Sequence, residues 1–431
     1  MLTSKTIRLR LALALVMFLF TFSSIANVQS ASAQGVPSVG VVCTEGPTFS
    51  LEAMSGYIQM PDMNNMYMWS YAPAGSSFQH PGPILCVNQG DTVTVTLTNS
   101  LPNYRSLPTR ASIIFPGQEN VQAGGSLAQP DLANNSLTNS IGPGGSVTYS
   151  FVASKPGTFL YESGTDPKMQ VAMGLFGALI VRPSLGSNFV YNRADSQFTP
   201  EEDFLALLSE IDPYQHQAVE MNKVFNMNNY RAHYWMINGR GFPDSIADNF
   251  APWLPSQPYG ALARIHPFGA AHPYPGVERY INVGTEDYPF HPHANNGLTI
   301  GRDGNPLEGA SGEDLSYEKF SFNIGPGQTW DSIFKWYDAE GYSDTPGPGY
   351  HPVPVALPDL VNMRLGMFYS GSPYLGKTAT LPPGINTLNQ CGEYYIISHN
   401  HALFQLDAFG QTMSGPITYL RVDPPTPNSC P

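Results

Sequence analysis

The sequence is poor in basic residues, in cysteine and in long apolar runs, and each shortage excludes a class of protein. Lysine and arginine number 20 against 33 aspartate and glutamate residues, so the formal net charge is −13. An acidic chain lacks the positive surface that binds phosphate backbones, which excludes a nucleic-acid partner, and anionic membranes repel it. Small cations, metal ions included, are attracted instead.

Cysteine is scarce: the chain has four, Cys43, Cys86, Cys391 and Cys430. None has a second cysteine or a histidine at the spacing of a metal site, which argues against thiolate coordination. Four cysteines in an oxidising compartment suit two disulfides, for which three pairings exist. Proximity within each end of the chain favours Cys43–Cys86 and Cys391–Cys430.

The one long apolar run lies at the N-terminus. Residues 11–22 follow three basic residues and precede the small-residue stretch 31–33, a pattern typical of a signal peptide over residues 1–33. No later run is apolar and long enough for a bilayer crossing. We therefore expect an exported protein, secreted or held in the periplasm or at the cell surface, with no membrane span in the mature chain.

Glycine and proline are plentiful, at 41 and 40 residues, whereas charged residues make up only 12% of the chain. Both residues disfavour helix interiors and favour turns. Aromatic residues are abundant enough for a buried core, which excludes a disordered chain. The composition predicts an all-β protein with long loops.

Short runs bounded by turn residues predict the strands. Residues 92–99 alternate apolar side chains with threonine, and similar runs up to residue 183 suggest a β-sandwich. Residues 184–200 have no apolar period and are typical of a linker. The helix-start residues at 199–202 favour a helix through residue 208 on local grounds alone. Further strand-like runs cover residues 234–238, 279–283, 298–301, 319–324, 330–336, 394–398 and 417–422, with long loops at 337–360 and 368–390.

Two His-x-His pairs, His291 with His293 and His399 with His401, carry the sharpest chemical signal. Side chains two apart in a strand point to the same face, so each pair presents two imidazoles side by side. On neighbouring strands, the two pairs would supply four nitrogen donors, a set suited to copper or zinc. In the alternative interpretation the histidines bond only to backbone carbonyls, in an inherited scaffold that holds no metal. The lone histidines are expected at the surface or in packing.

These stretches together resemble the multicopper oxidases, a family built from cupredoxin domains. The resemblance covers most of the chain after residue 33 and implies two cupredoxin-like Greek-key β-sandwich domains, at residues 34–183 and 201–431. It also implies a strand in place of the locally favoured helix at 203–211. The stretches that carry it are 83–91, 157–161 with 174–181, 203–212, 237–240, 325–329, the His-Pro-x-His-x-His-like motif at 288–293 and the His-Cys-His-like motif at 398–401.

Several ligand positions of that family are occupied by other residues here. In the family, a cysteine and histidines hold a blue-copper ion that passes electrons to three coppers on eight histidines. Tyr288 stands in place of one blue-copper histidine, and Asn400 stands in place of the cysteine. In the first domain, Ile114 and Pro116 stand at one histidine pair, and Glu162-Ser163-Gly164 stands at the other.

These losses leave a reduced site. Without the thiolate and with four of the eight cluster histidines, laccase-type four-electron reduction of oxygen is not expected. Glu162 is a candidate additional metal ligand; the alternative is a carboxylate that is solvated or hydrogen-bonded. Tyr288 is a candidate for orienting a ligand through a hydrogen bond from its hydroxyl; the alternative is that it only packs in the core. The expected ligands to one copper, or two at most, with zinc as a substitute, are His291, His293, His399 and His401.

The hypothesis for function is a copper-dependent oxidoreductase acting on a small molecule or a metal ion. One alternative is a copper-binding protein for storage or delivery, without turnover. Another is a metal-free structural protein of the cell surface. Because two-domain relatives of the family often assemble as trimers, the resemblance also implies a homotrimer.

Overall fold

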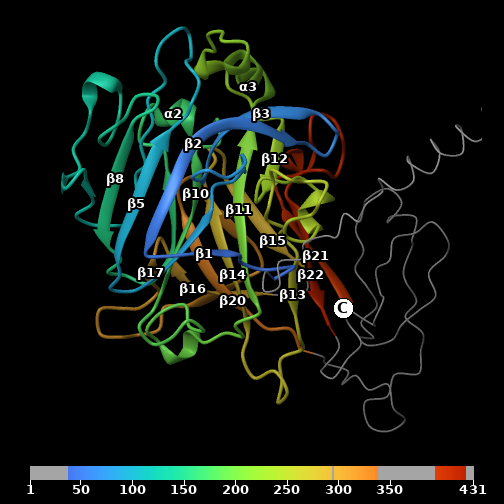
Figure 1. Ribbon diagram of the computed structural model, residues 1–431. Helices are drawn as coiled ribbons and strands as arrows, with labels where there is room; N and C mark the ends of the chain where they lie inside the picture. The colour runs from blue at the N-terminus through green and yellow to red at the C-terminus, as the bar shows by residue number, and fades with distance from the viewer. Residues whose placement is uncertain (1–36, 294–295, 338–393, 424–431) are drawn as a thin grey trace, which may run out of the picture. The chain divides into compact units, whose positions relative to one another are not determined.

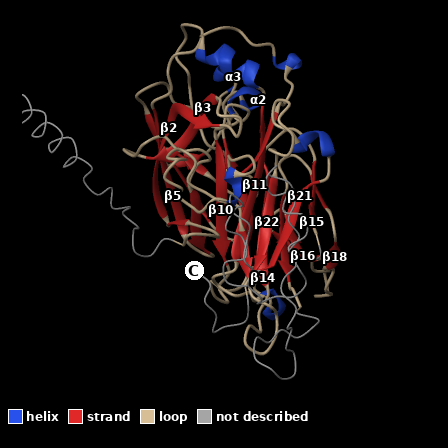
Figure 2. Cartoon of the chain, turned by 90° about the vertical axis from the view of Figure 1, so that its right-hand side faces the viewer, coloured by secondary structure: helices blue, strands red, loops and turns tan. Residues whose placement is uncertain are grey.

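The computed structural model describes residues 37–293, 296–337 and 394–423, which form four β-sheets with few helices (Figures 1 and 2). The expected all-β fold is confirmed. The two short α-helices in this part of the chain are α2 (Pro167–Gln170) and α3 (Pro213–Glu220). None of its helices has the length and apolar character that a bilayer crossing requires.

The first two sheets use strands that precede residue 183. The alternation predicted at 92–99 holds: Val93, Val95 and Leu97 are fully buried, and the threonines between them lie at the surface. In sheet order, the larger sheet comprises β3 (Asn65–Pro73), β2 (Thr48–Gln59), β5 (Thr92–Asn99), β8 (Ser146–Val152), β6 (Gln122–Ala123) and β7 (Ser126–Leu127), and the smaller comprises β1 (Cys43–Glu45), β4 (Ile84–Asn88), β10 (Phe176–Arg182) and β9 (Gly157–Glu162).

The other two sheets use strands that follow residue 202, and the smaller of them carries both His-x-His pairs. No described sheet mixes strands from the two sides of residues 184–200, although the domain limits themselves stay a prediction. In sheet order, the larger sheet comprises β12 (Tyr234–Ile237), β11 (Asp203–Ile211), β14 (Gly276–Asn282), β20 (Thr329–Phe334), β16 (Gly297–Arg302) and β17 (Asn305–Pro306), with β18 (Tyr317–Lys319) also on β16; the smaller comprises β13 (Ala263–Ile265), β22 (Ile417–Val422), β21 (Tyr394–Asn400), β15 (Tyr288–Pro292) and β19 (Phe322–Ile324).

The strand implied by the resemblance at 203–211 is confirmed as β11, so the locally favoured helix is wrong. β11 is buried almost throughout and pairs with β12 and β14, and these tertiary contacts outweigh the local helix-start residues. Helix α3 starts later: the Asp212 carboxylate accepts hydrogen bonds from the backbone N–H groups of Tyr214 and Gln215. The predicted loops at 337–360 and 368–390 lie outside the described residues, apart from residue 337.

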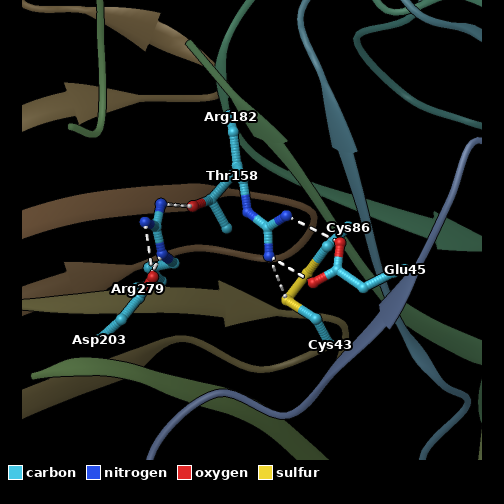
Figure 3. Close-up of a disulfide and its surroundings, with 7 residues drawn as sticks. All are labelled: Cys43, Glu45, Cys86, Thr158, Arg182, Asp203 and Arg279. Atoms are coloured by element: carbon cyan, nitrogen blue, oxygen red, sulfur yellow. Dashed lines mark hydrogen bonds and ion pairs between the residues drawn. A yellow bond between two sulfur atoms is a disulfide. The ribbon is translucent and has the colours of Figure 1, made fainter. Parts of the chain in front are cut away.

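The predicted disulfide Cys43–Cys86 is present and joins the paired strands β1 and β4 (Figure 3). Arg182 of β10 donates to both carboxylate oxygens of Glu45, at 2.7 Å each, and to Cys43 Sγ at 3.2 Å. The disulfide edge of the small sheet is therefore also held by an ion pair. The second predicted pairing, Cys391–Cys430, lies outside the described residues.

Strands from the two halves of the chain share a core and a buried polar contact. Side chains of β4, β9 and β10 form one apolar cluster with side chains of β11 and β14. Beside it, the buried Arg279 of β14 donates to Asp203 at 2.7 Å and to the Thr158 hydroxyl of β9 at 3.1 Å (Figure 3). Burial of this apolar area fixes the first pair of sheets against the second.

Candidate metal centre

Strand register brings the two His-x-His pairs together. Strands β15 and β21 are antiparallel neighbours, and His291 lies directly opposite His399. The backbone N–H of His293, just beyond β15, donates to Ile397 at 3.0 Å, and that of His401 donates to Pro289 at 2.7 Å. Two histidine pairs separated by more than a hundred residues therefore meet at one edge of these strands.

The four imidazoles form a compact cluster, with ring centroids of neighbouring rings 4.5 to 5.7 Å apart. The closest approach joins the two pairs: His293 Nε2 lies 3.0 Å from His399 Nε2. Two imidazole nitrogens bound to one ion at about 2.0–2.1 Å are themselves about 3 Å apart. The described residues contain no set of three or more histidine, cysteine, aspartate or glutamate side chains already arranged for an ion.

Backbone carbonyls orient two of these rings. His291 Nδ1 donates to the Phe320 carbonyl at 2.5 Å, and His399 Nδ1 donates to the Asn400 carbonyl at 2.8 Å. An Nδ1–H held by a carbonyl leaves Nε2 with its lone pair, which is the arrangement typical of metal-binding histidines. Phe320 lies between β18 and β19, where the single strand predicted at 319–324 is interrupted, so its carbonyl is available to His291.

The cluster favours neutral imidazole. Burial, together with the neighbouring His291, His399 and His401, lowers the pKa of His293 to about 4. Burial also lowers the pKa of His399, against the effect of its carbonyl contact. Because a metal ion competes with the proton for the same lone pair, rings that stay neutral are ready to bind it.

Tyr288 lies on the opposite face of β15 from His291 and is fully buried. Its hydroxyl donates to Glu210 Oε2 at 2.6 Å, while Thr285 donates to Glu210 Oε1 through its hydroxyl at 2.8 Å and through its backbone N–H. Burial raises the pKa of both Tyr288 and Glu210. The structure thus places Tyr288 on a carboxylate, with no contact to the four histidines.

Asn400 occupies a similar place on β21, and its side chain is fully buried. Its amide donates to Gln405 Oε1, and Gln405 Nε2 donates to Glu286 Oε2 at 2.7 Å. Glu286 also accepts from Trp235 Nε1 at 2.9 Å. A hydrogen-bonded amide and carboxylate chain therefore stands where the resemblance places the copper-binding cysteine.

Sequence reasoning missed the carboxylates and the amide that satisfy Tyr288 and Asn400. Glu210 had a detectable signal, since it is the one charged residue in the mainly apolar run 204–211. Gln405 lies in the short 3-10 helix Leu403–Leu406 and Glu286 lies in a loop, and the sequence of neither gives such an indication.

Glu162 is not brought to the histidine cluster. It ends β9 and lines a cleft of about 570 Å³, whose described lining contains no histidine. Burial raises the pKa of its carboxyl to about 7. Among the lone histidines, His266 and His272 stack with centroids 4.1 Å apart, and His266 Nδ1 lies 3.1 Å from Glu202.

Comparison with known proteins gives one family. A family model described as multicopper oxidase matches residues 74–185. An L-ascorbate oxidase of Cucumis sativus is 29% identical over 202 residues, which cover 45% of this chain and 30% of that protein. A second L-ascorbate oxidase, of Cucurbita pepo var. melopepo, is 30% identical over 150 residues, 35% of this chain and 23% of that protein. This chain thus matches less than a third of the length of these relatives.

Solved structures share the fold over most of the chain. The multicopper oxidase mgLAC has a TM-score of 0.56 at 18% identity, over 87% of this chain and 86% of its own. The blue copper oxidase of Nitrosomonas europaea has a TM-score of 0.56 at 17% identity, over 88% and 85%. Such identities establish the fold alone. The family model over residues 74–185 and the sequence relatives support a member of the multicopper oxidase family.

Proposed function

We propose that this protein is an exported member of the family with a reduced copper site, one ion or two at most, that serves as a copper-dependent oxidoreductase. The ligands are His291, His293, His399 and His401. The observation that carries the proposal is the 3.0 Å hydrogen bond between His293 Nε2 and His399 Nε2, because it holds one ring from each pair at a nitrogen separation that a bound ion would also require.

The donor set fits copper. Its members are imidazoles, two of them orient their rings through Nδ1 contacts to backbone carbonyls, and two have lowered pKa values. The family implies copper, whereas none of its relatives described above supports zinc. When bound, copper would supply one-electron redox chemistry at this edge of the sheet. The protein's own contribution is to hold the rings neutral and oriented.

In a laccase, the blue-copper site receives the electrons, and two of its ligand positions are occupied by other residues here. Neither Asn400 nor Tyr288 offers a thiolate or an imidazole, and each is engaged in its own hydrogen bonds. The other family positions are Ile114, Pro116 and the stretch at 162–164. Four-electron oxygen reduction of the laccase type is therefore outside the proposal, and the substrate is a small molecule or a metal ion that gives up electrons singly.

Copper titration followed by metal analysis tests the proposal. We expect tight binding of one equivalent, or of two, and oxygen uptake with a phenol, a metal-ion or an amine reductant. Copper binding without turnover under these conditions would favour the storage or delivery alternative. Absence of bound copper after reconstitution would overturn the proposal and favour a structural role.

Export and trimerisation belong to the same proposal. Fractionation of cells that produce the full chain tests export, and light scattering of the purified protein tests the trimer. If the protein is a monomer in solution, no second subunit contributes ligands, and residues of one chain alone must hold the copper.

A further inference from the structure

A second chemically distinctive feature is the cleft of about 570 Å³ that Glu162 lines. Its walls come from β9 and α2 on one side, and from β11 and residues 283–285 on the other. A volume of this size is in the range of small-molecule sites, about 300–1,000 Å³. The histidine cluster contributes nothing to its described lining.

Two carboxyl groups in this cleft have different surroundings. Glu210 accepts from Tyr288 and twice from Thr285, so its hydrogen-bonding capacity is largely used. The carboxyl of Glu162 is partly buried, and no side chain or backbone donor of the described residues contacts it. A carboxylate removed from water without a donor is costly, and a bound donor would lower that cost.

A second polar group lacks a partner as well. Ser209 is 2% exposed, lines the cleft, and its hydroxyl has no hydrogen-bond partner among the described residues. Buried hydroxyls without partners are uncommon in folded proteins. Together with Glu162, it offers a ligand one charged acceptor and one hydroxyl, contributed by the two walls of the cleft.

The rest of the lining is mainly apolar and partly aromatic, with Phe176, Tyr230, Val171 and Val283 among its members. Aromatic faces attract organic cations as well as apolar groups. Lys168 at the rim directs its ammonium to the Asn228 side chain at 3.2 Å. An anionic ligand would meet two carboxyl groups here, whereas a cationic one is complementary.

We propose that this cleft binds a small organic ammonium compound, with the ammonium on the Glu162 carboxylate and the apolar body against Phe176 and Tyr230. The Ser209 hydroxyl accepts or donates a further hydrogen bond. Because Glu162 has a pKa of about 7, and Glu210, Tyr230 and Lys168 are the other titratable groups of the lining, the affinity rises about tenfold from pH 6 to pH 8 as Glu162 loses its proton.

Calorimetry with copper-free protein tests this site independently of the metal centre. The probes are phenethylamine, phenethyl alcohol and phenylacetate, which share the phenyl ring and carry a cationic, a neutral and an anionic polar group. We expect binding of phenethylamine at pH 8, at least tenfold weaker binding of the alcohol, and none of the carboxylate. Glu162→Gln should weaken the amine at least tenfold, Ser209→Ala a few-fold, and the exposed control Glu318→Gln not at all.

A cleft-filling variant, Ala172→Trp, keeps the test decisive if a variant at Glu162 does not fold. It retains the carboxyl and should abolish amine binding while leaving the thermal unfolding temperature close to that of the wild type. The proposal is overturned if the alcohol binds as tightly as the amine, or if a folded Glu162→Gln or Ala172→Trp variant binds the amine as the wild type does.

Discussion

The two faces of the β15–β21 strand pair differ in a way that explains the protein's departure from its family. The outer face carries four imidazoles, at His291, His293, His399 and His401, and the Nε2 atoms of His293 and His399 contact each other. The inner face has Tyr288 and Asn400, where the resemblance expects copper ligands, and each now donates to a buried side chain. Since side chains alternate along a strand, the substituted positions and the four histidines lie on opposite faces.

The energetics of the two faces also differ. On the inner face, Tyr288 and Glu210 satisfy each other, while Asn400 Oδ1 has no hydrogen-bond partner among the described residues. On the outer face, two Nε2 atoms at 3.0 Å have at most one hydrogen between them when both rings are neutral. That hydrogen makes an N–H···N hydrogen bond, which an ion bound to both nitrogens would replace. The residues at the thiolate position have changed, whereas the four imidazoles of the proposed site are present.

The largest effect is expected from removal of the outer-face nitrogens. In His293→Ala/His399→Ala, the two closest donors are absent, and copper affinity should fall by about 100-fold or more. The measurement is competition against a chelator of known affinity. The matched control is His266→Ala/His272→Ala, which removes another adjacent histidine pair and should bind copper as the wild type does. Equal loss in both variants would contradict the assignment.

A substitution on the inner face is expected to have an intermediate effect, and to change stability alone. Tyr288→Phe removes one donor from the buried Glu210 and should lower the free energy of unfolding by about 1–3 kcal/mol. Copper stoichiometry should not change. Denaturant unfolding gives the first quantity, and Tyr214→Phe, at an exposed position, is the control. A loss of copper binding in Tyr288→Phe would show that the two faces are coupled.

A smaller effect is expected when the pH is lowered. The pKa of His293 is lowered to about 4, so its folded-state ring is neutral at pH values where an ordinary histidine is protonated. Copper should therefore be retained as the pH falls through 6, and be released only at about pH 4 to 5. Stability of the copper-free protein should likewise decline as pH falls below about 6.5, because the unfolded state binds more protons. Release of copper near pH 6.5 would indicate exposed, independent ligands.

No effect on the visible spectrum is expected from restoring the thiolate alone. Asn400→Cys would place a sulfur beside Gln405 and on the same face as Tyr288, neither of which is an imidazole, so no intense blue absorption should appear on copper addition. The companion variant Asn400→Cys/Tyr288→His/Gln405→His supplies the missing nitrogens and should give the blue band. A blue single variant would mean that other ligands complete the site.

Most of the fold was predictable because its signals are local. Alternation at 92–99 and the apolar runs at 394–398 and 417–422 gave strands that the structure confirms. The strand at 203–211 was not predictable locally, since its helix-start residues compete with pairing to β12 and β14; only the resemblance to a family gave it. Proximity was enough for Cys43–Cys86.

The sequence predicted the donor residues of the candidate site, but it did not predict the groups that orient them. Spacing identified the four histidines, and register then placed His291 opposite His399. The Phe320 carbonyl depends on a break within an expected strand, which composition does not show. Glu162 stands at a sequence position where the resemblance places ligand histidines. Only the three-dimensional arrangement shows that it lies in a separate cleft, whose described lining contains no histidine.

Spin resonance of the copper-loaded protein, with metal analysis on the same sample, tests the central claim most directly. We predict one copper, or two at most, a copper(II) signal with hyperfine splitting from imidazole nitrogens, and no intense blue absorption. The signal should be lost in His291→Ala/His399→Ala, which removes one ring of each pair. A nitrogen-free signal, or an unchanged signal in that variant, would contradict the proposed site.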